Sequence, residues 1–223
     1  MLETLFPNVM KRLPDFYQAI IDTVVMTFWS GAISFIFGMI VGVALIVTRK
    51  GGILENRAVF QVLDKLISFF RSIPFIILLT AVMPLSRAIM GTAIGVRGAI
   101  VPLIFGTVPF FSRQVETAIS ETDAGLIEAA KSMGSGPVDI IFRVYLRESV
   151  ASIARGVTIT MISLIGLTAM AGAVGAGGLG DFAVRYGHDR NMQDVTLATV
   201  IVLVLMVSLI QLAGSYIAKK NTH

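Results

Sequence analysis

Cysteine is absent from the 223-residue sequence, and charged residues are scarce. Without a thiol, the chain forms no disulfide and offers no thiolate for metal binding or redox chemistry. Asp, Glu, Lys and Arg together make up only 14% of the residues, against about 25% in ordinary soluble domains. Because 55% of the residues are hydrophobic and the mean hydropathy is +0.83, the composition predicts an integral membrane protein.

A phosphate-binding loop is also missing, since no G-x-x-x-x-G-K-[ST] pattern occurs. We therefore expect a chain that is not an enzyme and holds no cofactor of its own. The run from Gly175 to Gly180 fits the dinucleotide fingerprint G-x-G-x-x-G, but that fingerprint needs a preceding β-strand, and here it follows a long apolar run. We interpret the run as a backbone-flexible turn in which the glycines permit close packing or local unwinding. His188 has no histidine nearby, so no metal site is expected.

Long apolar runs predict five membrane-spanning helices of about 20 residues each. These spans cover about 24–47, 66–85, 98–112, 156–174 and 195–217, after an N-terminal segment 1–22 with a short interfacial helix near 16–20. Pro74 and Pro84 interrupt the second span, and Pro102 and Pro109 break the third. The predicted fold is one all-α transmembrane domain over residues 1–223, with spans two and three as walls of a pathway.

The distribution of positive charge predicts the orientation, because Lys and Arg accumulate in cytoplasmic segments. With the C-terminus inside, the cytoplasmic segments hold twelve of the eighteen cations and the outer segments hold six. This bias favours an outer N-terminus and a cytoplasmic C-terminus, and it accounts for the net charge of +4 without a nucleic-acid partner. Arg71 is expected to reach the lipid headgroups, or alternatively to pair with Glu116.

A polar island at 124–147 lies between the third and fourth spans, within the predicted cytoplasmic loop 113–155. Asp123 is suited to cap a first helix, and Gly134 is suited to end it in a left-handed conformation. Gly136 then breaks the chain, and Pro137 fits the first position of a second helix. Two short helices therefore meet at a glycine elbow.

Both helices of the island are amphipathic by their helical spacing. The apolar stripe of the first helix is Leu126, Ile127, Ala130 and Met133, and that of the second is Val138, Ile141, Phe142 and Tyr145. This arrangement is typical of a socket for another protein.

The island also carries a family motif. Glu128-Ala129-Ala130, then three residues, then Gly134, and after nine more residues Val144-x-Leu146, resembles the EAA signature of permease subunits of binding-protein-dependent ABC importers. The signature usually ends in a proline, where this chain has Arg147. The segments FRSIPFIILL at 70–79 and AMAGAVGAGGLG at 169–180 are similar to those of methionine importer permeases, and the similarity extends over about residues 22 to 217.

The resemblance implies a type I ABC importer permease that works as a homodimer in the bacterial inner membrane. Each copy would dock one cytoplasmic ATPase, which binds ATP and Mg, and an extracytoplasmic binding protein would deliver methionine, including the D-isomer. The coupling helix would lie between spans three and four, with contact residues Ala124, Leu126, Ile127, Glu128, Ala129, Ala130, Met133 and Gly134. The pathway candidates are Met170 as a gate, together with Thr168, Pro74 and Pro109.

Three alternatives remain open at this stage. The chain could be the permease of a related ABC importer for another amino acid or small polar solute. An ion-coupled carrier is disfavoured because the five spans contain no Asp or Glu. A membrane scaffold would not need proline-broken spans.

Overall fold

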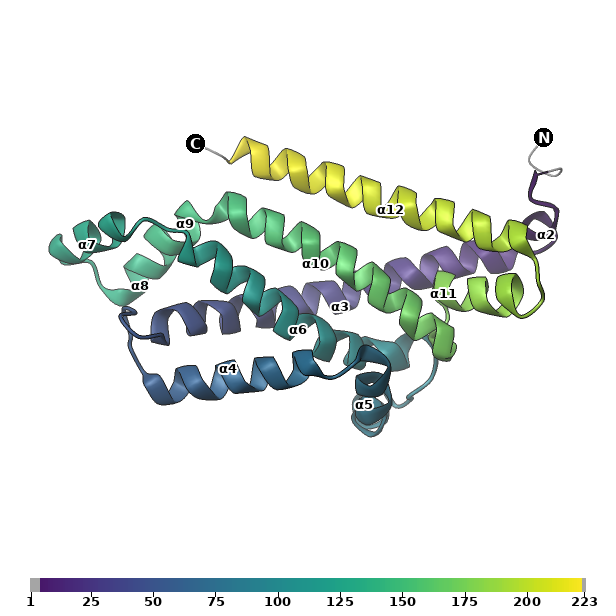
Figure 1. Ribbon diagram of the computed structural model, residues 1–223, viewed down its shortest axis with the longest axis horizontal. Helices are drawn as coiled ribbons and strands as arrows, with labels where there is room; N and C mark the ends of the chain where they lie inside the picture. Colours follow the sequence, from purple (N-terminus) through teal and green to yellow (C-terminus); the bar gives the residue numbers. More distant parts are fainter. Residues whose placement is uncertain (1–4, 222–223) are drawn as a thin grey trace. The chain divides into compact units, whose positions relative to one another are not determined.

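The computed structural model describes residues 5–221, and the regular structure of this part is entirely helical (Figure 1). The all-α prediction is therefore confirmed. The helices are α2 (Pro7–Lys11), α3 (Leu13–Thr48), α4 (Arg57–Ser72), α5 (Phe75–Met90), α6 (Gly95–Ser120), α7 (Ala124–Ser132), α8 (Pro137–Asp139), the π-helical η1 (Ile140–Tyr145), α9 (Leu146–Glu148), α10 (Val150–Ala171), the π-helical η2 (Gly172–Ala176), α11 (Gly178–Phe182), the π-helical η3 (Ala183–His188) and α12 (Gln193–Lys220).

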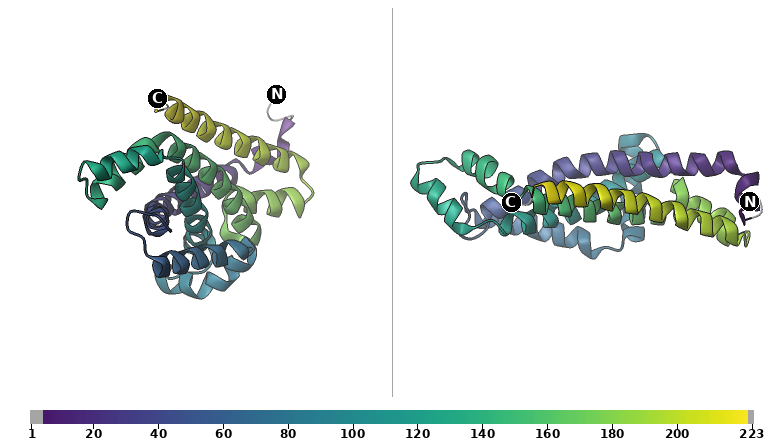
Figure 2. Two further views of the ribbon diagram at one scale, coloured as in Figure 1. Left: turned by 60° about the vertical axis from the view of Figure 1, so that its left-hand side comes forward. Right: turned by 90° about the horizontal axis from the view of Figure 1, so that it is seen from above.

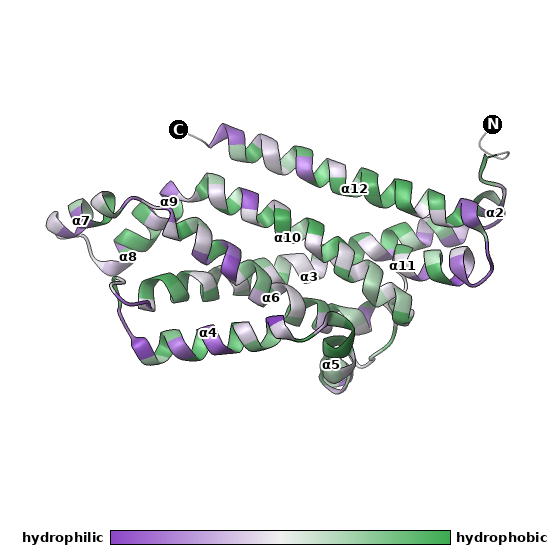
Figure 3. Cartoon of the chain, in the orientation of Figure 1, coloured by the Kyte–Doolittle hydropathy of each residue, from purple (hydrophilic) through white to green (hydrophobic). Residues whose placement is uncertain are grey.

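Four helical segments within the described residues are long and apolar enough to cross a membrane: Leu13–Thr48, Gly95–Ser120, Val150–Ala176 and Gln193–Lys220. A fifth candidate exists if the bent pair α4 and α5 is one span. Figure 3 shows mainly hydrophobic residues along α12, whereas hydrophilic and hydrophobic residues alternate along α4.

Helix α3 starts well before the first predicted span, because the segment expected to form a separate interfacial helix near 16–20 is its first part. The amide of Gln18 donates a hydrogen bond to Asp22 Oδ1 at 2.8 Å. Polar residues four apart thus satisfy each other on the helix surface, so the helix continues through them.

The predicted span 66–85 is two helices. α4 ends at Ser72 and α5 begins at Phe75, with Pro74 as its N-cap at φ −56° and ψ 135°. This extended ψ interrupts the helix, and a residue before proline is itself pushed away from the helical region. The polar residues from Arg57 to Lys65, which the sequence assigned to a loop, belong to α4.

The expected break in the third span does not occur, because α6 is continuous from Gly95 to Ser120 and passes through both Pro102 and Pro109. A proline inside a helix leaves the carbonyl four residues earlier without its N–H donor. At Pro102 that carbonyl belongs to Gly98, and the Ser86 hydroxyl donates to it at 2.5 Å. A side chain on α5 thus supplies the hydrogen bond that the proline cannot.

The chain divides into two compact units, which are described separately. The first comprises the chain up to Ile33, Ile73–Gly106 and Met161–Ile210. Its core joins the start of α3, α11, η3 and the start of α12, which gather near the N-terminus in both Figure 1 and Figure 2. Phe16 and Phe182 stack with ring centroids 5.2 Å apart. The Asn8 backbone and side-chain amides both donate to the Asp194 carboxylate at 2.9 Å, which ties α2 to α12.

The second unit comprises Ser34–Ser72, Thr107–Thr160 and the chain from Gln211 on. Its core packs the end of α3 and the second half of α6 against the short helices α7 to α9. Gly42 permits a close approach of α3 to α6, since a Cβ there would lie 2.6 Å from Val115 Cβ and 2.7 Å from the Ser112 carbonyl oxygen. The polar island is therefore seated on two of the long helices.

Candidate coupling surface and solute pathway

The first helix of the island, α7, has the predicted N-terminal cap. The Asp123 side chain accepts a hydrogen bond from the Gly125 N–H at 2.7 Å. Because the first backbone N–H groups of a helix have no partner within it, this bond satisfies one of them. The prediction of a capped start at Asp123 is confirmed.

The glycine elbow also forms as predicted. Gly134 has φ +82°, in the left-handed region. The Ser135 N–H donates to the Ala130 carbonyl and the Gly134 N–H to the Lys131 carbonyl, both at 3.0 Å, which is the hydrogen-bond pattern of a Schellman helix end. A Cβ at Gly134 would meet nothing within 4 Å. The conformation itself, and not crowding, therefore favours glycine at this position.

The second helix of the island starts at Pro137, directly after Gly136 at φ −72° and ψ 164°. It continues through η1 and α9 to Glu148. Arg143 and Asp139 form an exposed ion pair at 3.4 Å, one turn apart. The predicted start at Pro137 is confirmed, and Figure 2 shows α7 and this helix as two short segments joined by a turn.

The two apolar stripes are wider than the core beneath them. Ala130 and Tyr145 are buried, and Ile127 and Ile141 pack against the same core as partly buried residues. Burial raises the pKa of the Tyr145 hydroxyl, and the nearby Arg49 acts in the opposite direction.

The other half of each stripe is exposed. The exposed fractions are 45% for Leu126, 78% for Met133, 66% for Val138 and 65% for Phe142. Each stripe is therefore divided between the protein's own core and its exposed surface. Leu126 and Ile127 are about 100° apart around a helix, so a core on one side covers only one of them. We call these four residues the exposed island patch.

The predicted coupling residues divide in the same way. Ala124, Leu126, Glu128, Ala129 and Met133 are exposed, and Gly134 forms the elbow beside them. Ile127 is half-buried, and Ala130 is only 5% exposed. Ala130 therefore serves the protein's own core, whereas the close approach of a partner would have to use Ala129.

The four pathway candidates occupy different environments. Met170 on α10 is 40% exposed, whereas Thr168 is 1% exposed and its hydroxyl donates to the Ile165 carbonyl at 2.7 Å. Pro74 is exposed at the start of α5, and Pro109 is buried within α6. Of the four, Met170 and Pro74 are exposed at the surface of the protein.

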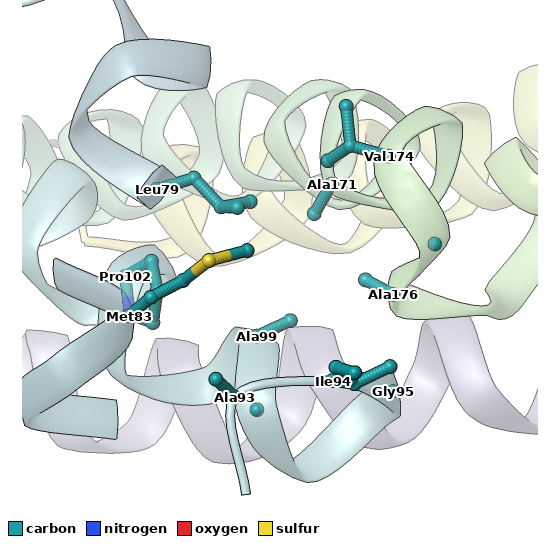
Figure 4. A pocket seen from close by; sticks show the side chains of 12 residues that line it. Leu79, Met83, Ala93, Ile94, Gly95, Ala99, Pro102, Ala171, Val174 and Ala176 are labelled. Carbon is teal, nitrogen blue, oxygen red and sulfur yellow. The ribbon is translucent and has the colours of Figure 1, made fainter. Parts of the chain in front are cut away.

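A small pocket of about 40 Å³ lies in the first unit, between α5, the start of α6 and the segment after α10 (Figure 4). Figure 4 shows the Met83 side chain extending from α5 into the space between Leu79 and Ala99. Every side chain lining the pocket is apolar, and its volume suits a few waters at most. No charged or polar side chain lines the pocket to bind an amino acid, so it is not a solute site by itself.

Thr23 holds the glycine run in place through a contact that the sequence analysis missed. Its hydroxyl accepts a hydrogen bond from the Leu179 N–H at 2.8 Å, where the glycine run turns back toward α3. Gly177 and Gly178 have φ of +83° and +77°, and a Cβ at Gly178 would lie 2.7 Å from Thr23 Oγ1. The interpretation of the glycine run as a turn that allows close packing is confirmed.

Arg113 is a second missed residue. It forms ion pairs with Asp64 on α4 and with Glu116 on its own helix, the latter at 2.7 Å. Its Nη2 also lies 3.3 Å from the Ser68 hydroxyl. Glu116 is thus paired with Arg113 and not with Arg71, which is exposed. The network joins α6 to α4, and the sequence analysis placed part of α4 in a loop. Its prediction would have required the position of α4 beside α6.

Comparison with known proteins agrees with this architecture. The chain is 42% identical over 202 residues to the probable D-methionine transport system permease protein MetI of Vibrio cholerae, covering 91% of this chain and 90% of that protein. It is 41% identical over 217 residues to the methionine import system permease protein MetP of Bacillus subtilis, covering 97% of each.

Solved structures show the same fold. A chain from the inward-facing MetNI methionine ABC transporter superposes with a TM-score of 0.91 at 42% identity, covering 96% of this chain and 99% of that one. A chain from an amino acid ABC transporter with histidines gives 0.79 at 16% identity, which supports the fold alone. The family of binding-protein-dependent transport system inner membrane components matches residues 34–221. The all-helical bundle, its candidate spans and these matches establish that the chain belongs to the family of inner membrane components of binding-protein-dependent transport systems.

Proposed function

We propose that the chain is the membrane-spanning subunit of a methionine importer, driven by ATP hydrolysis in a separate subunit. The observation that carries the proposal is identity above 40% over more than nine-tenths of the chain to permeases named for methionine transport. L-methionine is the expected solute, and the relative in Vibrio cholerae named for D-methionine supports uptake of both isomers.

The working assembly is two copies of this chain, two cytoplasmic ATPase subunits and one extracytoplasmic binding protein. The structural likeness to the MetNI transporter supports the ATPase partner. ATP and Mg bind to the partner, since this sequence contains no phosphate-binding loop.

The exposed island patch is the surface that we assign to the ATPase. Four large apolar side chains are exposed on two short helices that are seated on a core, and the first of these helices is capped by Asp123. Exposed apolar clusters of this kind mark interaction sites. The assignment requires the island on the cytoplasmic side, as the charge bias favours, with the N-terminus outside and the C-terminus inside.

Met170 remains our candidate for a gate residue in the solute path. Its thioether is flexible, it is 40% exposed on α10, and its neighbours Ala169 and Ala171 are small. A long side chain beside small ones can fill a narrow path between two copies. Thr168 and Pro109 are buried, so we assign them to the walls behind the path.

The test is reconstitution of the chain with its ATPase in proteoliposomes, with binding protein outside. Methionine-loaded binding protein should stimulate ATP hydrolysis and drive uptake of labelled methionine. Stimulation by a different amino acid and not by methionine would be consistent with an ABC importer but would refute methionine as its substrate.

A matched pair of variants tests the coupling surface. Phe142→Ala, in the exposed island patch, should weaken ATPase binding, whereas Phe69→Ala should not, although Phe69 is similarly exposed at 59%. Equal binding by both variants would refute the assignment of the patch. Unchanged uptake and unchanged basal ATP hydrolysis in a Met170→Ala variant would refute the assignment of Met170 as a gate.

A further inference from the structure

Four buried side-chain hydroxyls among the described residues have no hydrogen-bond partner: those of Thr27, Ser30, Ser34 and Thr107. Other buried hydroxyls of the long helices, such as those of Ser112 and Thr160, donate to the carbonyl four residues earlier in their own helix, at 2.8 and 2.7 Å. Ser34 and Thr107 are only 0% and 2% exposed. A buried hydroxyl that makes no hydrogen bond is costly, so these two side chains need a partner.

The packing of α3 against α6 follows a constant register. A Cβ at Gly38 would lie 2.7 Å from the Phe111 ring, and a Cβ at Gly42 would lie 2.6 Å from Val115 Cβ. In both contacts the residue of α6 lies 73 positions after the residue of α3, and the two contacts are one helical turn apart. The two helices therefore run in the same direction, and each turn of α3 meets one turn of α6.

The same register places Ser34 opposite Thr107, one turn before the contact of Gly38, because Thr107 also lies 73 positions after Ser34. Both residues belong to the second unit, and both lie near the middle of candidate membrane spans. The two hydroxyls form no direct hydrogen bond with each other, since neither has a partner. Lipid supplies no hydrogen bonds at this depth, so only a small polar molecule held between the helices can satisfy both hydroxyls.

We propose that one water molecule is bound between Ser34 Oγ and Thr107 Oγ1 and joins α3 to α6. The water accepts a hydrogen bond from each hydroxyl, and it donates its two hydrogens to backbone carbonyls of the two helices, whose oxygens have a second lone pair. Four hydrogen bonds lie within the usual range for a buried water. The site goes beyond the transport function and does not depend on which solute is carried.

Thermal unfolding of the purified permease in detergent tests the water through its two partners. Ser34→Ala and Thr107→Val each remove one hydroxyl and should lower the midpoint by at least about 2 °C. The double variant should lose less than the sum of the two, because both changes act on the same water. Ser112→Ala is the matched control, since Ser112 is 0% exposed but its hydroxyl bonds within α6. It should shift the midpoint less than either single variant.

A structure of the permease at a resolution that shows ordered waters is the direct measurement. Density for one water is expected about 2.8 Å from both hydroxyl oxygens, in the wild type and in Thr107→Ser but not in Thr107→Val. A direct bond between the two hydroxyls with no density between them, or a bond from each hydroxyl to its own helix, would overturn the inference. Unchanged or raised midpoints in both Ser34→Ala and Thr107→Val would overturn it too, because they would mean that the hydroxyls make no bond at all.

Discussion

The glycine elbow yields a prediction whose size follows from the backbone. Gly134 has φ +82°, a region that costs an L-residue about 1–2 kcal/mol. A Cβ there would meet nothing within 4 Å, so crowding adds nothing to that figure. If the elbow must be formed when the ATPase docks, Gly134→Ala should weaken docking by about 5- to 30-fold. Gly134→Val should have a larger effect, since a β-branched residue is a true outlier at positive φ.

Gly134→Asn and Gly136→Ala are the controls. Asparagine tolerates the left-handed region, so Gly134→Asn should weaken docking of the ATPase least among the three Gly134 variants. Gly136 has φ −72° and ψ 164°, which any residue adopts, so Gly136→Ala should bind like the wild type. The assay titrates the ATPase subunit against the permease in lipid nanodiscs, and a scan of thermal unfolding shows that the bundle itself is unchanged. Wild-type binding by both Gly134→Ala and Gly134→Val, or equal loss in Gly136→Ala, would refute the reasoning.

Three further predictions concern the packing of the long helices. Gly42→Ala should destabilise the purified permease by about 1–3 kcal/mol, because its Cβ would lie 2.7 Å from a backbone carbonyl of α6, whereas at Gly166 a Cβ meets nothing within 4 Å. Gly166→Ala should therefore leave the midpoint of thermal unfolding in detergent nearly unchanged. Thr23→Val removes the acceptor of the buried Leu179 N–H and should cost about 1–3 kcal/mol, with faster hydrogen exchange of that amide. Ser86→Ala removes the hydroxyl that donates to the Gly98 carbonyl, which has no N–H donor because of Pro102. This variant should lower the thermal midpoint more than Ser72→Ala, because the Ser72 hydroxyl donates only within its own helix.

The local features of the island could be predicted from the sequence. A cap at Asp123, a left-handed Gly134 and a helix start at Pro137 each depend on residues within a few positions of one another. The physical causes, which are an unpaired N–H, the absence of a Cβ and the fixed φ of proline, act without knowledge of the rest of the chain. The structure has all three.

Features that depend on distant residues could not be predicted in this way. Pro102 was expected to break a helix, but the hydroxyl of Ser86, on another helix, supplies the missing hydrogen bond. The width of the apolar stripes on the island was predictable, but which half meets the core depends on where Phe111 and Ile46 lie beneath them. One half of each stripe packs against the core and the other half is exposed. Helical spacing alone cannot tell which half is which.

Charge counting illustrates the same limit for α4. The count placed Arg57 and Lys65 in a cytoplasmic loop, whereas both lie in a helix that is half polar and half apolar. The orientation argument survives this correction, because the rule applies to cations near the ends of spans as well as in loops. The functional meaning changes, however. A cation in a loop helps to orient the protein, whereas a cation on α4 also lies on a fixed face of a helix that Arg113 joins to α6.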